Sequence, residues 1–382
     1  MPIQGSWIAS GGTLYAGSFQ TLYKSLDQGV TWQPLITFIG STPVEIDRVY
    51  VNELNYIFVS PNSSATANEL GLWRSINHGQ TWSQVLALPL SCNIWAMAED
   101  SNGNLFAGVY TTGSSESNAR IYRSTDGGAT WVSVYYNSSA RHIHCIAVDG
   151  TDNYVYASVG DELGPWNINY IIRSTDGGNT WTQILSGIPQ IIAIVCVPGA
   201  RLFAADAATD GEIYRTTNDV SFTSVLDTGV QSYGYWMRTN DLNGNIYASF
   251  VGGENPAHYV AGIWMSTNNG LSWTVYKTFN IHNAYLGSCT TSNFFQGTMY
   301  YDLELDNGWQ NGTKIYPDAL YNNIDTAPAD SLSQLSSSIA QWVPLALVSI
   351  AVSNIVSLKI LAFRTKKKKP KTKNKINYPL EL

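Results

Sequence analysis

The chain has 382 residues, of which only 13% are charged, with 32 Gly, 23 Tyr and 13 Trp. Lys and Arg number 21 against 28 Asp and Glu, and the basic residues gather at the C-terminal end, so that the first 338 residues hold 12 basic and 27 acidic side chains. Such an acidic globular part argues against a nucleic-acid partner. The many glycines and aromatics are typical of a turn-rich all-β fold.

The N-terminal residues carry no sign of export. Met1 to Trp7 contain neither a basic stretch nor an apolar one, so the sequence predicts no secretory signal. The cysteines lie far apart without a C-x-x-C pair, and they are Cys92, Cys145, Cys196 and Cys289. We expect buried thiols rather than disulfides or metal ligands. Neither a metal nor a cofactor is expected.

One eight-residue pattern then recurs about every fifty residues. It reads STDGGATW at Ser124–Trp131 and STDGGNTW at Ser174–Trp181. Looser copies begin at Ser25, Ser75, Thr216 and Ser266. In each copy the Asp or Asn can accept hydrogen bonds from its own turn, and the Gly can take a positive φ. An apolar run precedes every copy, which indicates the tight turn of a β-hairpin. We call these six segments the box turns.

A second motif, of the type Asn-Gly-Asn-Leu-Phe106-Ala-Gly, precedes most box turns and is a strong hairpin signal. Each repeat then holds four strands, and a period near fifty residues indicates a propeller or solenoid. The first strands are expected around 6–10, 45–51, 93–98, 142–148, 190–196, 234–239 and 284–290. The sequence therefore predicts a seven-bladed β-propeller over residues 1–325, with six blades as the alternative.

The box pattern S-x-D-x-G-x-T-W resembles the Asp-box, or BNR, repeat of the sialidase-like β-propellers. The resemblance covers roughly residues 5 to 280 and implies the propeller fold. It leaves the function open, because proteins with this repeat include sialidases, endoglucanase-like hydrolases, sorting receptors and non-catalytic assembly factors.

The C-terminal part has a different composition. Residues 326–338 suit a linker or stalk, residues 339–363 form an apolar stretch with Lys359 as its only charge, and residues 364–382 are rich in lysine. This order predicts a single-pass helix in a lipid bilayer, with an amphipathic surface helix as the alternative. The lysines predict an interior C-terminus, which places the propeller outside, on a cell surface or a virion envelope.

An active site is harder to find. A sialidase would need converging arginines, but the arginines before successive box turns occupy one repeated position, and they are Arg74, Arg123, Arg173 and Arg215. The acidic pairs Asp161/Glu162 and Asp206/Asp210 could serve a glycosidase.

Aromatic and polar residues on the first strands and in the irregular connections opposite the box turns instead favour a binding surface. The candidates are Arg141, His142, His144, Trp166, Tyr170, Trp236, His258 and Tyr259. Flat rings beside polar donors suit sugars or protein hot spots, although any of them could pack between blades. We therefore expect a non-catalytic recognition or adhesion module for a glycan or protein receptor, such as a virion attachment spike. The alternatives are a membrane-tethered glycoside hydrolase and a membrane-complex assembly factor.

Overall fold

The computed structural model divides the chain into two units, Met1–Asp325 and Thr326–Leu382. It describes residues 4–8, 12–27, 29–40, 44–62, 64–112, 119–161, 168–187, 189–207, 211–229, 232–239, 243–252, 261–279, 300–303 and 314–317. The predicted linker, membrane helix and lysine-rich tail lie outside these ranges. Within them, no helix has the length and apolarity that a membrane span requires.

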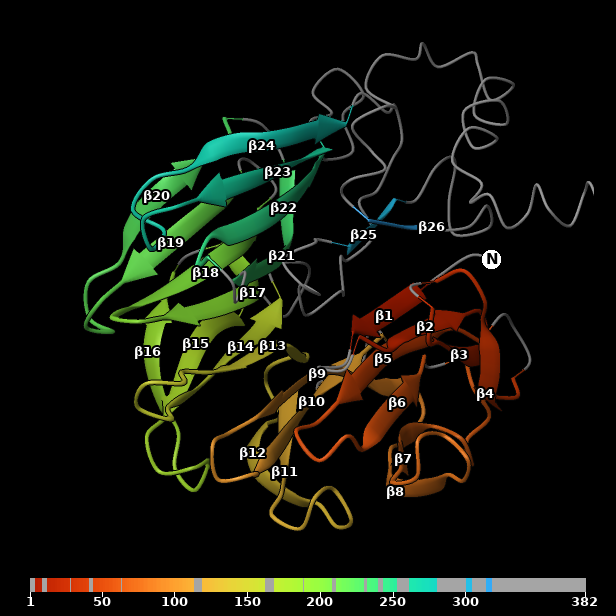
Figure 1. The fold of residues 1–382 in the computed structure, drawn as a ribbon. Helices are drawn as coiled ribbons and strands as arrows, with labels where there is room; N and C mark the ends of the chain where they lie inside the picture. Colours follow the sequence, from red (N-terminus) through yellow and green to blue (C-terminus); the bar gives the residue numbers. More distant parts are fainter. Residues whose placement is uncertain are drawn as a thin grey trace, which may run out of the picture. The chain divides into compact units, whose positions relative to one another are not determined.

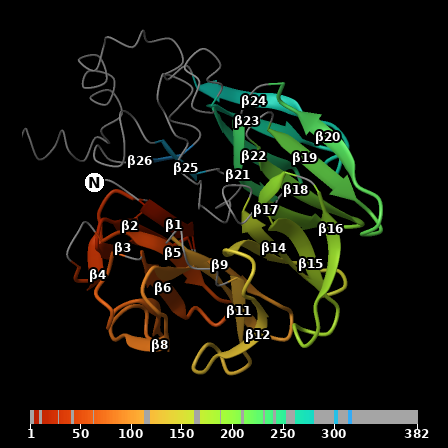
Figure 2. The same ribbon diagram turned by 180° about the vertical axis from the view of Figure 1, so that it is seen from behind.

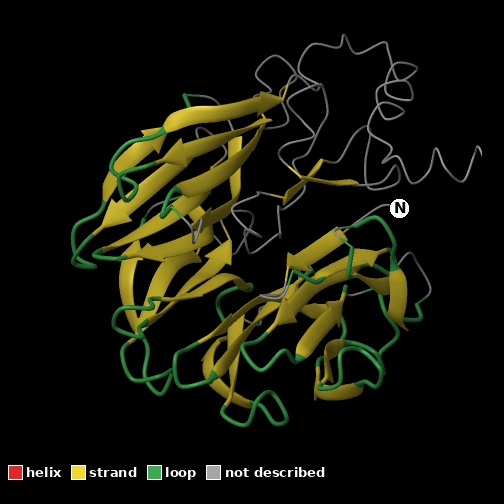
Figure 3. Cartoon of the chain, in the orientation of Figure 1, coloured by secondary structure: helices red, strands yellow, loops and turns green. Residues whose placement is uncertain are grey.

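The first unit repeats a four-stranded antiparallel arrangement (Figure 3). The first strands are β1 (Gln4–Ile8), β5 (Ile46–Val51), β9 (Cys92–Glu99), β13 (Ile143–Val148), β17 (Gln190–Val197) and β21 (Ser232–Thr239). The second strands are β2 (Leu14–Ser18), β6 (Ile57–Pro61), β10 (Leu105–Thr111), β14 (Val155–Asp161), β18 (Ala200–Ala207) and β22 (Ile246–Gly252).

The outer half of each repeat contains the strands on either side of a box turn. The third strands are β3 (Thr21–Ser25), β7 (Gly71–Ser75), β11 (Ala119–Ser124), β15 (Ile168–Ser174), β19 (Glu212–Thr216) and β23 (Ala261–Ser266). The fourth strands are β4 (Gln33–Thr37), β8 (Ser83–Ala87), β12 (Val132–Asn137), β16 (Thr182–Ser186), β20 (Thr223–Asp227) and β24 (Thr274–Phe279). We refer to the six repeats as sheets one to six, although sheets five and six are also hydrogen-bonded to each other through β18 and β21.

Consecutive sheets pack side by side through their first strands, with β1 against β5, β5 against β9, and so on to β21 (Figures 1 and 2). The predicted four-stranded repeats are therefore confirmed for the described part of the chain. The predicted first strands agree with the observed ones within two residues for the first six repeats. The seventh, at 284–290, lies outside the described residues.

A last pair of strands, β25 (Tyr300–Leu303) and β26 (Lys314–Pro317), repeats the pattern of second and third strands. Tyr300 pairs with Pro317 as Phe106 pairs with Arg123 in sheet three. The sequence before Tyr300, Gly-Thr-Met, also parallels the Gly-Asn-Leu before Phe106. This register favours a seventh repeat, and the blade count of seven stays a prediction.

The box turns have the hydrogen bonds that their sequence predicts. In sheet three, Ser124 Oγ lies 2.7 Å from Asp126 Oδ1 and accepts from the Gly128 amide at 2.9 Å. Asp126 also accepts from the amide of Thr130 at 2.9 Å and from its hydroxyl at 2.7 Å. The ring of Trp131 then meets Phe58 of the preceding sheet edge-on, with centroids 6.4 Å apart. Each turn therefore closes its own hairpin and packs on its neighbour.

The repeated basic position before each box turn joins one sheet to the next. Its side chain donates to the backbone carbonyl that follows the Asp or Asn of the next box turn. The bonds are Lys24 Nζ to His78 O at 3.3 Å, Arg74 to Gly127 O at 2.9 Å, Arg123 to Gly177 O at 2.6 Å and Arg215 to Asn269 O at 3.0 Å. Arg173 instead pairs with the Asp219 carboxylate at 2.7 Å. These basic side chains are inter-sheet links, as their repetition in the sequence suggested.

Candidate functional site

The strand directions place the candidate residues at one end of the sheets. Every third strand runs into a box turn, so the antiparallel first strands begin, and the second strands end, at the opposite end. We call this the top end and the end with the box turns the bottom end. Arg141, His142, Asp47, Asn93 and Asp161 all lie at the top end, because each is at the start of a first strand or the end of a second one.

All six first strands have a register shift near the top end. Pairing with the second strand skips one residue in sheets one to five, and this residue is Gly5, Asp47, Trp95, His144 or Ile192 in turn. In sheet six the pairing is interrupted between Tyr233 and Trp236. Such β-bulges bend a strand and re-aim a side chain, and they are common beside active sites. Among the first five sheets, only sheets two to four carry a polar or aromatic residue at this position.

Among the described carboxyl groups at the top end, Asp47 has a strongly raised pKa. It is half-buried and accepts a hydrogen bond from the amide nitrogen of Asn93, which is fully buried on β9. Burial raises the pKa of Asp47 to about 7, and repulsion by Glu45 adds to this rise, while Arg48 and the Asn93 hydrogen bond oppose it. Asp47 therefore keeps a proton on a substantial fraction of molecules at neutral pH.

A row of rings continues from this point into sheet four. Asn93 pairs with Tyr110 across β9 and β10. The Tyr110 ring stacks on His142 with centroids 4.0 Å apart. The rings of Trp95 and Tyr110 are tilted to each other, with centroids 4.9 Å apart. Trp95 and Tyr110 are both half-buried, so part of each ring is accessible to solvent.

The two histidines form a buried, neutral pair. Nδ1 of His142 lies 3.2 Å from the Thr111 carbonyl, which can only accept, so this nitrogen carries the hydrogen. The Nε2 atoms of His142 and His144 are 2.7 Å apart, and the side-chain amide of Gln190 lies 2.9 Å from His144 Nε2. Burial lowers the pKa of His142 to about 2 and that of His144 to about 4. Both rings are therefore uncharged at neutral pH.

Asp161 provides a second carboxylate at the top end. It ends β14, is 5% exposed and forms an ion pair with Arg141. Its Oδ2 lies 3.8 Å from His142 Nε2. Asp47 and Asp161 are thus joined by one series of neighbouring residues, through Asn93, Tyr110 and His142, across sheets two to four. The site has an acidic group at each end of this series and aromatic rings between them.

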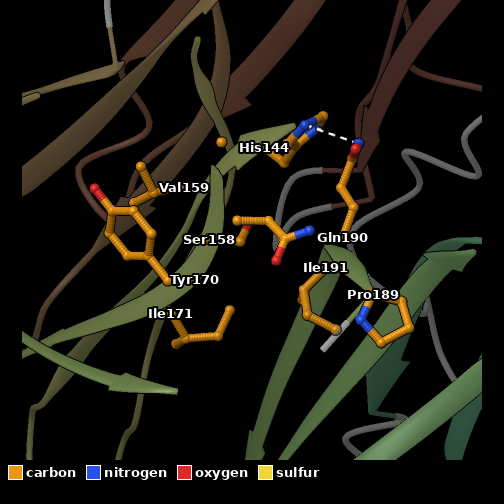
Figure 4. A pocket seen from close by; sticks show the side chains of 10 residues that line it. His144, Ser158, Val159, Tyr170, Ile171, Pro189, Gln190 and Ile191 are labelled. Carbon is orange, nitrogen blue, oxygen red and sulfur yellow. Dashed lines mark hydrogen bonds between the residues drawn. The ribbon is translucent and has the colours of Figure 1, made fainter. Parts of the chain in front are cut away.

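A small pocket lies beside this series, between sheets four and five. Figure 4 shows His144 bonded to Gln190 on one side of the pocket, with Pro189 and Ile191 near Gln190 and Tyr170 on the opposite side. The hydroxyl of Tyr170 lies 2.6 Å from that of Tyr135, and this bond ties the ring to sheet three.

The structure brings together Arg141, His142 and His144 and places Tyr170 at the nearby pocket. Trp236 is buried, with 4% exposure, and its indole nitrogen has no hydrogen-bond partner in the part of the chain described. Trp166, His258 and Tyr259 lie outside the described residues, as do Glu162 and Asp210. The binding role of all eight predicted residues stays a prediction.

The sequence reasoning missed four residues of this site, and they are Asp47, Asn93, Trp95 and Tyr110. A charged pair, Asp47-Arg48, at the start of an apolar first strand was the available signal. Among the residues that the structure describes, no group of three His, Cys, Asp or Glu could hold a metal ion, and Cys92, Cys145 and Cys196 form no disulfide.

Comparison with known proteins finds relatives that are named as enzymes. No protein-family model matches the chain. The xyloglucanase Xgh74A of Acetivibrio thermocellus is 26% identical over 174 residues, which cover 39% of this chain and 20% of that enzyme. A xyloglucanase of a Paenibacillus species is 27% identical over 171 residues, which cover 38% of this chain and 16% of that enzyme. The chain thus spans a fifth or less of these relatives.

Solved structures show the fold. The GH74 xyloglucanase of Xanthomonas campestris superposes with a TM-score of 0.52 at 16% identity, covering 72% of this chain and 45% of that enzyme. An ancestral GH74 enzyme gives a TM-score of 0.53 at 17% identity, covering 82% of this chain and 46% of that enzyme. The fold is a β-propeller.

The expectation of a non-catalytic recognition module is contradicted, because the relatives found by sequence are named xyloglucanases. The alternative prediction, a glycoside hydrolase, has the better support. The lack of converging arginines argues only against substrates that carry a carboxylate, whereas hydrolysis of a neutral glycan needs two positioned carboxyl groups.

Proposed function

We propose that this chain is a propeller-type glycoside hydrolase that cleaves xyloglucan or a related polysaccharide at the top end of sheets two to four. The observation that carries the proposal is the sequence similarity to two xyloglucanases. The top end supports it, because Asp47 and Asp161 lie in one series of contacts there and half-buried rings lie between them.

In this proposal Asp47 is the general acid. A glycosidase must protonate the departing glycosidic oxygen, and a carboxyl group can do so near neutral pH only if its pKa is raised. Burial and the neighbouring Glu45 raise the pKa of Asp47 to about 7. In other glycosidases, an apolar or like-charged environment likewise raises the pKa of the acid above that of the second carboxyl group.

Asp161 is the second carboxyl group. Its Oδ2 forms an ion pair with Arg141, and His142 Nε2 lies 3.8 Å from the same oxygen. A charged carboxylate can activate water or attack the sugar directly, depending on its distance from the acid. Arg141 is a positioning residue in this scheme. Because His142 is neutral, it adds no second positive charge beside Asp161.

Release of reducing ends from xyloglucan tests the proposal. Asp47→Asn and Asp161→Asn should each lower the rate by about 10²–10⁴-fold, because each removes one proton-transfer group. Asp227→Asn is the matched control, since Asp227 is exposed at the top end of the outer strand β20. Wild-type activity in the Asp47→Asn variant, or no cleavage of xyloglucan or of related β-glucans by the native chain, would contradict the proposal.

We also propose that the chain belongs to the Asp-box group of propellers. The support is the shared hydrogen bonding of its box turns, in which a Ser hydroxyl bonds the Asp or Asn and accepts from the Gly amide. This pattern recurs at Ser25, Ser75, Ser124, Ser174 and Ser266.

The membrane anchor remains a second, separate proposal that rests on the sequence alone. An apolar stretch followed by a lysine cluster supports a single span with an interior C-terminus and an exterior propeller. Protease added to intact cells or particles should digest the propeller. A propeller that is digested only after detergent is added would show the opposite orientation.

A further inference from the structure

A polar pocket opens at the bottom end, between sheets three and four. Its volume is about 410 Å³, and small-molecule sites commonly occupy roughly 300–1,000 Å³. Four turns bound it, namely the turns between β9 and β10 and between β13 and β14, and the box turns after β11 and β15. The amides and hydroxyls in its wall belong to Asn102, Asn104, Thr125, Asn153, Thr175 and Asn179. We call this cavity the bottom pocket.

One residue of the repeat distinguishes this position from its neighbours. Asn104 directly precedes β10, and the corresponding residues before β6 and β14 are Tyr56 and Tyr154. In those two sheets the basic side chain before the box turn lies over the tyrosine ring. The guanidinium of Arg74 is 5.7 Å from the Tyr56 centroid, and that of Arg173 is 5.3 Å from the Tyr154 centroid. Sheet three has an amide where sheets two and four have a ring.

The space beside the next box turn differs accordingly. A Cβ added to Gly127, in the box turn of sheet three, would lie 3.3 Å from the Tyr56 ring and 3.7 Å from Leu54. At Gly177, the corresponding residue of sheet four, the nearest atom to such a Cβ would be Asn104 Nδ2 at 3.9 Å. A tyrosine ring therefore fills, between sheets two and three, the space that is open between sheets three and four.

The charged groups of the bottom pocket are paired within the protein. Arg123 donates to two groups of the next box turn, at 2.6 and 2.8 Å. Asp152 forms an ion pair with Arg201. Asp176 accepts from the amide and the hydroxyl of its own turn, at 2.9 and 2.7 Å. The pocket thus offers a ligand many amides and hydroxyls without an uncompensated charge.

We propose that the bottom pocket binds a neutral sugar unit. Side-chain amides and hydroxyls both donate and accept hydrogen bonds, as the hydroxyl groups of a sugar ring also do. An apolar ligand would leave these polar groups without partners, and a charged ligand would find no free ion of opposite sign. The sugar ring would take the place that the Tyr56 ring fills between sheets two and three. This site lies at the opposite end from the proposed hydrolase site and does not depend on it.

Titration of the full native chain with xylose, glucose and galactose tests the site, with binding followed by saturation-transfer NMR of the sugar. A monosaccharide has no second sugar to release, so cleavage cannot interfere. No aromatic ring lines the bottom pocket, so we expect saturable binding in the millimolar range. Sugar bound at the top end contributes equally to all variants, and the prediction therefore concerns the difference between them.

Asn104→Tyr is the decisive variant, because it adds the ring that sheets two and four already hold at this position. It should remove the saturable signal of the bottom pocket while the Tm stays within a few degrees of the native value. Asn179→Ala should weaken binding about three- to tenfold, the effect of one lost hydrogen bond. Gln80→Ala is the matched control, since Gln80 has the same place in the box turn of sheet two and is exposed outside the pocket.

Three results would overturn the proposal. The first is a native chain that shows no saturable binding of any of the three sugars. The second is undiminished binding in Asn179→Ala relative to Gln80→Ala, which decides the matter even if Asn104→Tyr does not fold. The third is tighter binding of glucuronate than of glucose, which would show that the ligand is charged. Release of reducing ends from xyloglucan is measured separately and should be unchanged in Asn104→Tyr, so failure of one proposal is distinguishable from failure of the other.

Discussion

His142 and His144 are buried side by side without charge, and Asp47 titrates in the opposite sense. An unfolded histidine takes up a proton below about pH 6.5, whereas burial keeps the folded pKa near 2 and 4. The unfolded state therefore binds more protons as the pH falls, and stability decreases. For Asp47 the folded pKa is raised to about 7, so its ionisation removes stability as the pH rises from about 4 to 7.

The first prediction uses this difference in sign. In the Asp47→Asn background, lowering the pH from 7 to 5 should cost about 2 kcal/mol of unfolding free energy for each histidine. Adding His144→Gln should remove roughly half of that loss. Urea titrations at both pH values measure it, and a stability independent of pH between 5 and 7 in the Asp47→Asn variant would refute the neutral buried pair.

The second prediction concerns the closest approach of a box turn to its neighbour. Gly128 has φ +81°, and a Cβ added there would lie 2.4 Å from Phe58 Cε1. Gly103 has nearly the same backbone, at φ +78°, with nothing within 4 Å of such a Cβ. Gly103→Ala should therefore cost only the backbone strain, about 1 kcal/mol, and Gly128→Ala about 1–3 kcal/mol more from overpacking. Similar losses for both, by denaturant titration, would argue against tight inter-sheet packing.

At the scale of elements, the sheets are joined by side chains that the repeat pattern had already singled out. Arg123 donates to Gly177 O at 2.6 Å and to Asn179 Oδ1 at 2.8 Å in the next box turn. Met265 takes this position in sheet six, and the sequence that follows has no further box turn to receive a bond. The basic donor and the box turn that would accept its hydrogen bond are thus absent together, which indicates that the two form one link between sheets.

The third prediction tests that link. Arg123→Met should destabilise the protein by about 1–3 kcal/mol, because it leaves a carbonyl of the next box turn without its charged donor. Arg120→Met, on the same strand, should cost less than about 1 kcal/mol, since it loses contacts with the rings of Tyr122 and Tyr136 in its own sheet. Chemical denaturation of both variants compares them directly, and an equal loss would show that the link to Gly177 adds nothing.

The repeat made strands predictable, but not the bulges that build the site. Six box turns in register placed the first strands within two residues, because turn chemistry and period are local properties. The positions of Asp47, Trp95 and His144 as extra residues depend on pairing with the second strand, which the sequence does not specify. At the bulge in sheet four, the rings of His142 and His144 meet edge-on with centroids 4.2 Å apart.

At the scale of the whole molecule, an acidic propeller carries its candidate chemistry on three successive sheets, away from the box turns. The chain matches a fifth or less of the length of its xyloglucanase relatives, so activity has to be measured on this chain itself. A buried carboxyl group without full compensation lowers the folding stability, so selection for stability alone would not retain it. We therefore expect Asp47→Asn to raise the Tm at pH 8 by roughly 2–4 °C while it lowers the rate of cleavage by about 10²–10⁴-fold.

The most direct measurement is kcat/KM for xyloglucan between pH 4 and pH 9, which reports the ionisations of the free enzyme. A general acid must be protonated to act, and burial raises the pKa of Asp47 to about 7. The rate should therefore fall about tenfold for each pH unit above 7, and Asp47→Asn should show no such limb because it has no carboxyl group at this position to ionise. A rate that stays constant up to pH 9, or an unchanged profile in Asp47→Asn, would contradict the assignment.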